Sequence, residues 1–101
     1  MMQQCKVGTV TGTGAAINIQ LGWVPDYVKV INYTDGDTIH EWFNGMTAGH
    51  AIKTDTAVAK ITANGITAYE GTAAANSKGF TIGTDVSESA DVLYYFAMRN
   101  P

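Results

Sequence analysis

Apolar and polar residues alternate along this chain in short runs with a period of two. In the clearest run, Ile17, Ile19 and Leu21 lie on one side and Asn18 and Gln20 lie on the other. Successive side chains of a β-strand point to opposite faces, so this run predicts a strand with one buried side and one solvated side. Short runs of this kind, separated by glycine-containing turns, favour strands over helices throughout the chain.

A first pair of strand-like runs is joined by residues typical of a tight turn. Residues 27–33 and residues 38–43 are rich in apolar and aromatic side chains, and Asp35-Gly36 lies between them. A tight turn between two strands needs positive φ angles, which glycine adopts without steric cost. We therefore predict an antiparallel hairpin here.

A second hairpin is predicted further along the chain. Residues 55–63 contain alanines that a helix would accept, but their threonine and valine content and the alternation within residues 58–63 favour a strand. Asn64-Gly65 separates this strand from residues 66–69 in the pattern of a hairpin turn. Because no helical crossover lies between these runs, the sheets are expected to be antiparallel.

The remaining strand candidates complete an all-β chain. The small residues of 71–79 predict an exposed loop, which leads into a short strand at 80–83. Residues 92–99 form the most apolar run and predict a central strand that is apolar on both faces, although residues 86–91 before it lack the glycine expected in a turn. With a further strand at 6–10, the pattern gives about eight short strands, as in an antiparallel β-sandwich or a jelly-roll-like barrel.

Length, charge and cysteine content narrow the possible partners and locations. The chain has 101 residues and is expected to form one domain over residues 1–101. Its six basic residues are scattered and its net charge is −3, so no nucleic-acid partner is predicted. No run approaches the roughly 20 apolar residues needed to cross a bilayer, so no membrane span is predicted. Residues 1–6 do not resemble a secretory signal, and Cys5 is the only cysteine. We therefore expect folding in a reducing cytosol without a disulfide.

His40, Glu41 and His50 are the first candidates for a metal site because they lie close together in the sequence. Zinc needs three or four converging ligands, and neighbouring strand residues point to opposite faces, so His40 and Glu41 are not expected to bind one ion together. His40 is instead expected to be a partly exposed strand histidine. Asp35-Gly36-Asp37 lacks the further oxygen ligands of a calcium loop and is explained by the turn. No metal or other cofactor is expected.

Candidate nucleophiles give no catalytic pattern either. The chain has no G-x-S-x-G motif, and its serines, Ser77, Ser87 and Ser89, all fall in loop-like segments. Cys5 lies near the amino terminus with only a lysine as a basic neighbour, which is typical of an inert thiol. The sequence therefore predicts a protein without catalytic residues.

Aromatic residues make up 10% of the chain, and most of them, including Phe96, are expected to fill the core. Trp23 lies in a Gly-Trp-Val-Pro turn, where it is expected either to cap one end of the core or to anchor a partner. The candidate interface residues are Trp23, Pro25, Tyr33 and Trp42.

Three segments carry a resemblance to a known class of proteins. They are G-W-V-P-D-Y-V-K-V at 22–30, G-F-T-I-G-T-D at 79–85 and Y-Y-F-A-M-R at 94–99. In this order and spacing the chain resembles small virion structural proteins of tailed bacteriophages, in particular head decoration or cement proteins. The resemblance implies a virion location with assembly in the host cytoplasm, a homotrimer, and the major capsid protein as a partner.

Similar segments also occur in modules of phage tails and fibres, so a second function stays open. In that alternative the chain is a carbohydrate- or receptor-binding β-sandwich, and exposed Trp23, Trp42 or Tyr33 stacks on the ligand. Aromatic side chains suit both functions because they provide a large contact area at low entropic cost.

Overall fold

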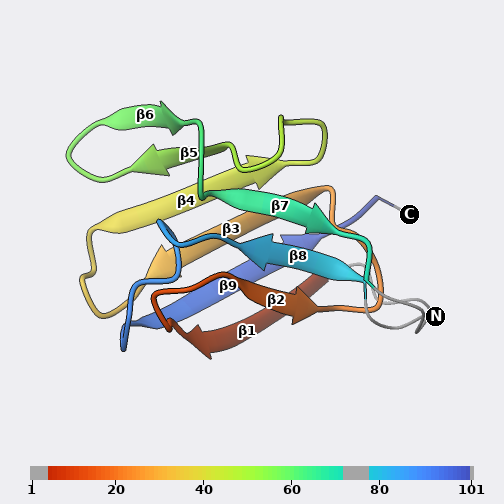
Figure 1. The fold of residues 1–101 in the computed structure, drawn as a ribbon, viewed down its shortest axis with the longest axis horizontal. Coiled ribbons are helices and arrows are strands. Elements are labelled where there is room, and N and C mark those ends of the chain that lie inside the picture. Colours follow the sequence, from red (N-terminus) through yellow and green to blue (C-terminus); the bar gives the residue numbers. More distant parts are fainter. Residues whose placement is uncertain (1–4, 72–77, 101) are drawn as a thin grey trace.

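The computed structural model describes residues 5–71 and 78–100, and within them it contains strands and no helix (Figure 1). The all-β prediction is confirmed, with nine strands where about eight were expected. The described residues thus hold no helix that could cross a membrane. The strands are β1 (Cys5–Thr11), β2 (Ile17–Gln20), β3 (Tyr27–Asn32), β4 (Thr38–Phe43), β5 (Ala51–Thr54), β6 (Val58–Ile61), β7 (Ile66–Tyr69), β8 (Gly79–Ile82) and β9 (Val92–Met98).

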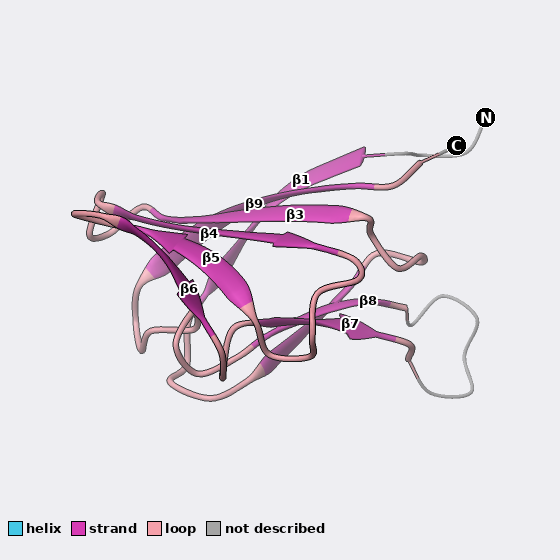
Figure 2. Cartoon of the chain, turned by 90° about the horizontal axis from the view of Figure 1, so that it is seen from above, coloured by secondary structure: helices cyan, strands magenta, loops and turns pink. Residues whose placement is uncertain are grey.

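The strands form two sheets that pack face to face, as predicted for a β-sandwich (Figure 2). The larger sheet has the strand order β1-β9-β3-β4-β5-β6, and the smaller has the order β2-β8-β7. Each pairing between these strands is antiparallel. Figure 2 shows β5 and β6 curving toward the smaller sheet, while β1, β9, β3 and β4 form a flatter layer. The smaller sheet covers only one face of the larger one.

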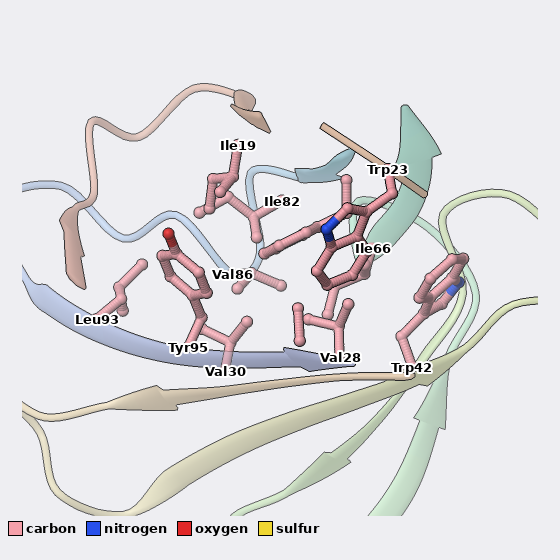
Figure 3. Close-up of a cluster of buried hydrophobic side chains, with 12 residues drawn as sticks. Ile19, Trp23, Val28, Val30, Trp42, Ile66, Ile82, Val86, Leu93 and Tyr95 are labelled. Atoms are coloured by element: carbon pink, nitrogen blue, oxygen red, sulfur yellow. The ribbon is translucent and has the colours of Figure 1, made fainter. Parts of the chain in front are cut away.

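The hydrophobic core fills the space between the two sheets (Figure 3). Phe80 of the smaller sheet and Tyr95 of the larger sheet meet edge to face, with ring centroids 5.6 Å apart. This pair joins the two layers directly, because each ring projects from its own sheet into the interior. The buried cluster consists of Ile19, Trp23, Val28, Val30, Trp42, Ile66, Phe80, Ile82, Val86, Leu93, Tyr95 and Ala97.

The first predicted hairpin is confirmed, but its turn is longer than expected. β3 and β4 pair from Tyr27 opposite Phe43 to Asn32 opposite Thr38, which leaves residues 33–37 as the connection. Gly36 adopts a φ of 75°, and its backbone N–H donates to the carbonyl of Asn32 over 2.9 Å. The Asn32 side chain also accepts a hydrogen bond from a backbone N–H within this loop. The longer loop is therefore closed by hydrogen bonds to Asn32, the last residue of β3.

The second predicted hairpin is wrong. β6 pairs with β5 in the larger sheet, whereas β7 pairs with β8 in the smaller one, so Asn64-Gly65 carries the chain from one layer to the other. Asn64 does adopt a positive φ of 59°, and Gly65 lies so close to Gly49 that its added Cβ would be 2.7 Å from the Gly49 carbonyl oxygen. Ile66 is fully buried while β6 is largely exposed. Burial of Ile66 in the second layer thus explains the crossing.

The sequence predictions for the segments before and after β8 had different outcomes. Most of the predicted loop at 71–79, namely residues 72–77, lies outside the described residues, and the strand after it is β8. The expected turn glycine before the last strand is replaced by Ala90, which itself adopts a positive φ of 66°. Its backbone N–H donates to the carbonyl of Gly12 over 2.9 Å. This contact holds the alanine in a conformation that glycine would adopt more easily.

The last strand is interior in its sheet but buried on only one face. β9 lies between β1 and β3, as predicted for a central strand. Leu93, Tyr95 and Ala97 point into the core, whereas Tyr94 and Met98 are exposed on the opposite side. The expectation that both faces are covered is therefore wrong, because the only layer that packs on this sheet among the described residues is the three-stranded one. An apolar strand face is left open.

Candidate interaction surface

The outer face of the larger sheet gathers the exposed large hydrophobic residues of the described chain. We call this surface the open face and define it by the outward-pointing residues of β1, β9, β3 and β4. These are Val7, Thr9, Tyr94, Phe96, Met98, Tyr27, Lys29, Ile31, Ile39, Glu41 and Phe43. Tyr33 extends it beyond the end of β3, and Val58 lies on the same side of β6. The exposed large hydrophobics are Val7, Ile31, Tyr33, Phe43, Val58, Tyr94 and Met98.

Strand register produces the open face from residues that are distant in sequence. Phe96 lies opposite Val7 on one side and opposite Lys29 on the other, and Lys29 lies opposite Glu41. Because side chains alternate along each strand, the residues two positions before and after each member of this row also point outward on the open face. The neighbouring row across the four strands is Thr9, Tyr94, Ile31 and Ile39.

Aromatic contacts order the side chains of the open face. The Tyr27 ring packs against Phe43 at a centroid distance of 5.0 Å and against Phe96 at 6.4 Å. At the other end of the face, Tyr33 and Tyr94 meet at 5.3 Å with their rings at 76°. Side chains that are already packed lose less conformational entropy when a partner covers them. The aromatic side chains of the open face are thus already packed against one another.

Two charges of opposite sign lie at the middle of the open face. Glu41 accepts a hydrogen bond from the Tyr27 hydroxyl over 2.7 Å. Desolvation and this hydrogen bond to the carboxylate raise the pKa of Tyr27 to about 12. Lys29 is the cross-strand neighbour of Glu41 but forms no ion pair among the described residues. The open face therefore presents one cationic and one anionic group surrounded by apolar and aromatic surface.

The four candidate interface residues from the sequence do not lie on one surface. Trp23 and Trp42 are only 7% and 2% exposed and belong to the core, and Pro25 is fully buried. Tyr33 is 66% exposed and lies at the end of the open face. The Arg99 guanidinium covers one side of Trp23, 5.2 Å from the ring centroid. Trp23 thus occupies the core-capping position, and the side chains that do form a surface, such as Phe43, were missed.

The expectation that Phe96 fills the core is also wrong. Its side chain is half-buried on the open face, between the strand neighbours Val7 and Lys29. The core residues of the same strand are Tyr95 and its alternate neighbours. An apolar run of this kind does not itself reveal which of its two faces the second sheet covers.

An open depression of about 600 Å³ lies beside Trp23 at one end of the sandwich. Glu70 and Lys78 at its rim form an ion pair, with 3.8 Å between Oε1 and Nζ. Both side chains of this pair are largely exposed, so the pair is worth little energetically. The residues that line the depression are Gly22, Trp23, Val24, Asn44, Glu70, Lys78 and Arg99.

His40, Glu41 and His50 do not converge on one point. His40 points into the interior and is only 3% exposed, so the expectation of a partly exposed histidine is wrong. Glu41 points outward, as the facing argument predicted, and His50 lies half-buried between β4 and β5. Burial lowers the pKa of His40 to about 4, and nearby Lys53 adds to this effect. Its Nε2 atom is buried without a hydrogen-bond partner among the described residues.

A different acidic cluster is formed by residues that are remote in sequence. Carboxylate oxygens of Asp35, Glu88 and Asp91 lie within 4.8 Å of one another, the one such group of metal-capable side chains in residues 5–71 and 78–100. The buried Asn32 amide donates to Glu88 over 2.9 Å and to Asp91 over 3.0 Å. Two of the three carboxylates therefore already have a protein donor. The expectation that no metal is required stays a prediction.

Replacing Asn32 with Ala is expected to destabilise this end of the sandwich. The substitution removes the donor shared by Glu88 and Asp91 and the acceptor of the Asp35 backbone N–H. Hydrogen bonds to charged groups contribute about 1.5–3 kcal/mol each, so we expect the free energy of unfolding to fall by at least about 2 kcal/mol. Urea unfolding measures the change, and replacement of exposed Asn18 with Ala is the control. Equal effects of the two substitutions would contradict a special role of Asn32.

The candidate nucleophiles occupy different environments within the described residues. Ser87 is fully buried, and its hydroxyl oxygen accepts a hydrogen bond from the Thr13 backbone N–H over 3.1 Å. Cys5 is an exposed thiol at the start of β1. Ser77 lies outside the described residues. Ser87 thus has a structural role, joining the loops that follow β1 and β8.

Comparison of the chain with models of known families, with curated proteins and with solved structures finds no match.

Proposed function

We propose that this chain is a non-enzymatic structural protein of a tailed-phage virion, which decorates the outside of the head. The observation that carries the proposal is the open face, where seven large hydrophobic side chains are exposed on one side of one sheet and its extensions. Soluble monomers rarely expose a large contiguous apolar surface, and such a surface is typical of a site of protein association. The open face is the part of the described chain best suited to that role.

The composition of the open face favours a protein partner. Nucleic-acid binding requires clustered cations, but the open face has only Lys29, whose charge is offset by Glu41. Small substrates bind in concave sites with converging polar groups, whereas this face is the surface of a sheet. A binding function that depends on burial of apolar area fits the geometry best.

The assignment to a phage head is supported by the resemblance of residues 22–30, 79–85 and 94–99. Residues of these segments form the start of β3, the whole of β8 and most of β9, so they build both layers of the sandwich. A decoration protein binds a repeating lattice in many copies, and many weak contacts then stabilise the shell together. The major capsid protein is the partner that this role requires.

Binding to phage heads tests the proposal. Heads of the phage that encodes the chain, prepared without it, are mixed with purified chain and sedimented, and electron cryomicroscopy locates the bound density. We expect saturable binding at regular lattice positions. Replacing Ile31 with Asp places a charge on the open face and is expected to weaken binding at least tenfold, whereas replacing exposed Gln20 on β2 with Asp is the matched control. Density on the tail alone, or no binding, would contradict head decoration.

One observation favours carbohydrate or receptor binding as a second candidate. Tyr33 is exposed and packs edge to face against Tyr94, which leaves an aromatic surface on which a sugar ring can stack. Trp23 and Trp42, by contrast, are buried and do not offer such a surface. Saturable binding to an immobilised glycan panel, lost when Tyr33 is replaced with Ala, would favour this candidate.

A further inference from the structure

The charges on the open face are arranged so that the face complements itself. Lys29 and Glu41 are cross-strand neighbours on β3 and β4, and Lys29 has no ion pair among the described residues. Consider a two-fold axis that runs parallel to the strands, between β3 and β4, in the plane of contact. It places Lys29 of each copy opposite Glu41 of the other. The two-fold axis therefore forms the Lys29–Glu41 ion pair twice, once in each direction, as an isologous interface requires.

The apolar residues follow the same symmetry. The axis between β3 and β4 places Ile31 of one copy over Ile39 of the other, and Tyr27 over Phe43, because these residues are register partners. One strand further out it places β9 over β5, so that Phe96 faces Ile52. Along β3 and β4, apolar side chains thus meet apolar side chains on both sides of the charged pair, whereas further out Val7 of β1 lies over Lys60 of β6.

We propose that the open face binds a second copy of this chain about this two-fold axis, with β3 and β4 of the two copies in contact and β9 and β1 of each copy over β5 and β6 of the other. The inference rests on the premise, shared with the proposed function, that the open face is an association surface. It adds a second copy of the chain as a partner that competes with the phage head for the same face, and it gives the register of that contact. It also differs from the homotrimer that the resemblance implies, because a face that complements itself across a two-fold axis closes as a dimer.

The dimensions of the face indicate a weak dimer. Strands about 4.8 Å apart and about 20 Å long give a projected area of roughly 400 Å² for four strands and roughly 600 Å² for six. Two copies then bury about 800–1,200 Å², at the lower limit of specific interfaces. We expect a concentration-dependent dimer in the micromolar range or weaker, which can separate when the same face binds a phage head.

Charge reversal with rescue tests the register. Sedimentation velocity is measured over a concentration series for the wild-type chain and for the Lys29→Glu and Glu41→Lys variants. Each variant alone brings like charges together, so its dimer is expected to be at least tenfold weaker. An equimolar mixture of the two variants is expected to regain dimer, since one variant supplies two carboxylates and the other two ammonium groups. Lys78→Glu, on the exposed Lys78 outside the open face, is the control for net charge.

Thermal melts of each variant establish that it is folded, and the mixture keeps the test valid because rescue requires two folded chains. A wild-type chain that stays monomeric or forms a trimer would overturn the inference. Dimers that survive both substitutions, or variants that fail to recover on mixing, would overturn it as well. A dimer that does not bind phage heads would refute only the proposed function, and a monomer that does bind them would refute only the inference.

Discussion

Replacing Phe80 with Ala is expected to lower the free energy of unfolding by about 3–5 kcal/mol. Phe80 has no exposed surface, and its ring meets Tyr95 between the sheets, so the substitution leaves a cavity where the two layers join. A domain holds about 5–15 kcal/mol in total, and the variant is therefore expected to be partly or largely unfolded at ambient temperature. Urea unfolding followed by tryptophan fluorescence measures the loss, because both tryptophans lie in the core.

Phe96 provides the matched control for this prediction. The same Phe to Ala change at Phe96 removes a half-buried ring from the open face, where it packs against Tyr27. We expect a loss of about 1 kcal/mol, because the site does not become a closed cavity. Self-association of the Phe96 variant should nevertheless weaken. Equal destabilisation by both substitutions would show that the open face is covered in the isolated chain.

Acidification is expected to destabilise the fold through His40. Burial lowers the pKa of His40 from 6.5 to about 4, so the folded state favours the neutral imidazole. Between these two values the unfolded chain binds a proton that the folded chain does not, and stability is lost as the pH falls from about 6.5 to about 4. Above pH 6.5 the contribution is fully present. A difference of this size corresponds to about 3 kcal/mol.

The charges around His40 come from three segments. Lys53, its cross-strand neighbour on β5, lowers its pKa, whereas Asp85 and Asp55 act in the opposite direction with smaller effect. Replacing His40 with Leu should flatten the pH dependence of unfolding between pH 6.5 and 4. Replacing the half-buried His50 with Gln is the control and should leave the dependence in place. Urea midpoints at pH 7, 5.5 and 4 compare the three chains, and a dependence unchanged by His40→Leu would exclude this origin.

Local patterns in the sequence determined most of the strand positions. The alternation around Ile19 predicts β2 because it records one buried and one solvated side, and the turn at Asp35-Gly36 predicts the β3–β4 hairpin because the glycine adopts a positive φ. These signals depend on residues that are close in the chain. They hold in the structure because backbone geometry and side-chain alternation act locally.

The layer to which each strand belongs was decided by tertiary structure. Asn64 adopts the positive φ of a turn residue, yet Asn64-Gly65 joins two sheets, because Ile66 is buried in the second layer. Distant parts of the chain also decide which of the two faces of a strand is buried. Trp42 lies inside and Phe43 outside only because the smaller sheet packs on one particular face of β4.

The candidate surface and the acidic cluster depended on the same non-local packing. The sequence shows that Tyr94, Phe96 and Met98 are apolar, but it does not show that three strands cover one side of β9 and leave the other open. Glu88 approaches Asp35 only once β9 pairs with β3. Composition and alternation thus determined a two-layered β-protein, while pairing between distant strands decided which apolar residues became core and which became surface.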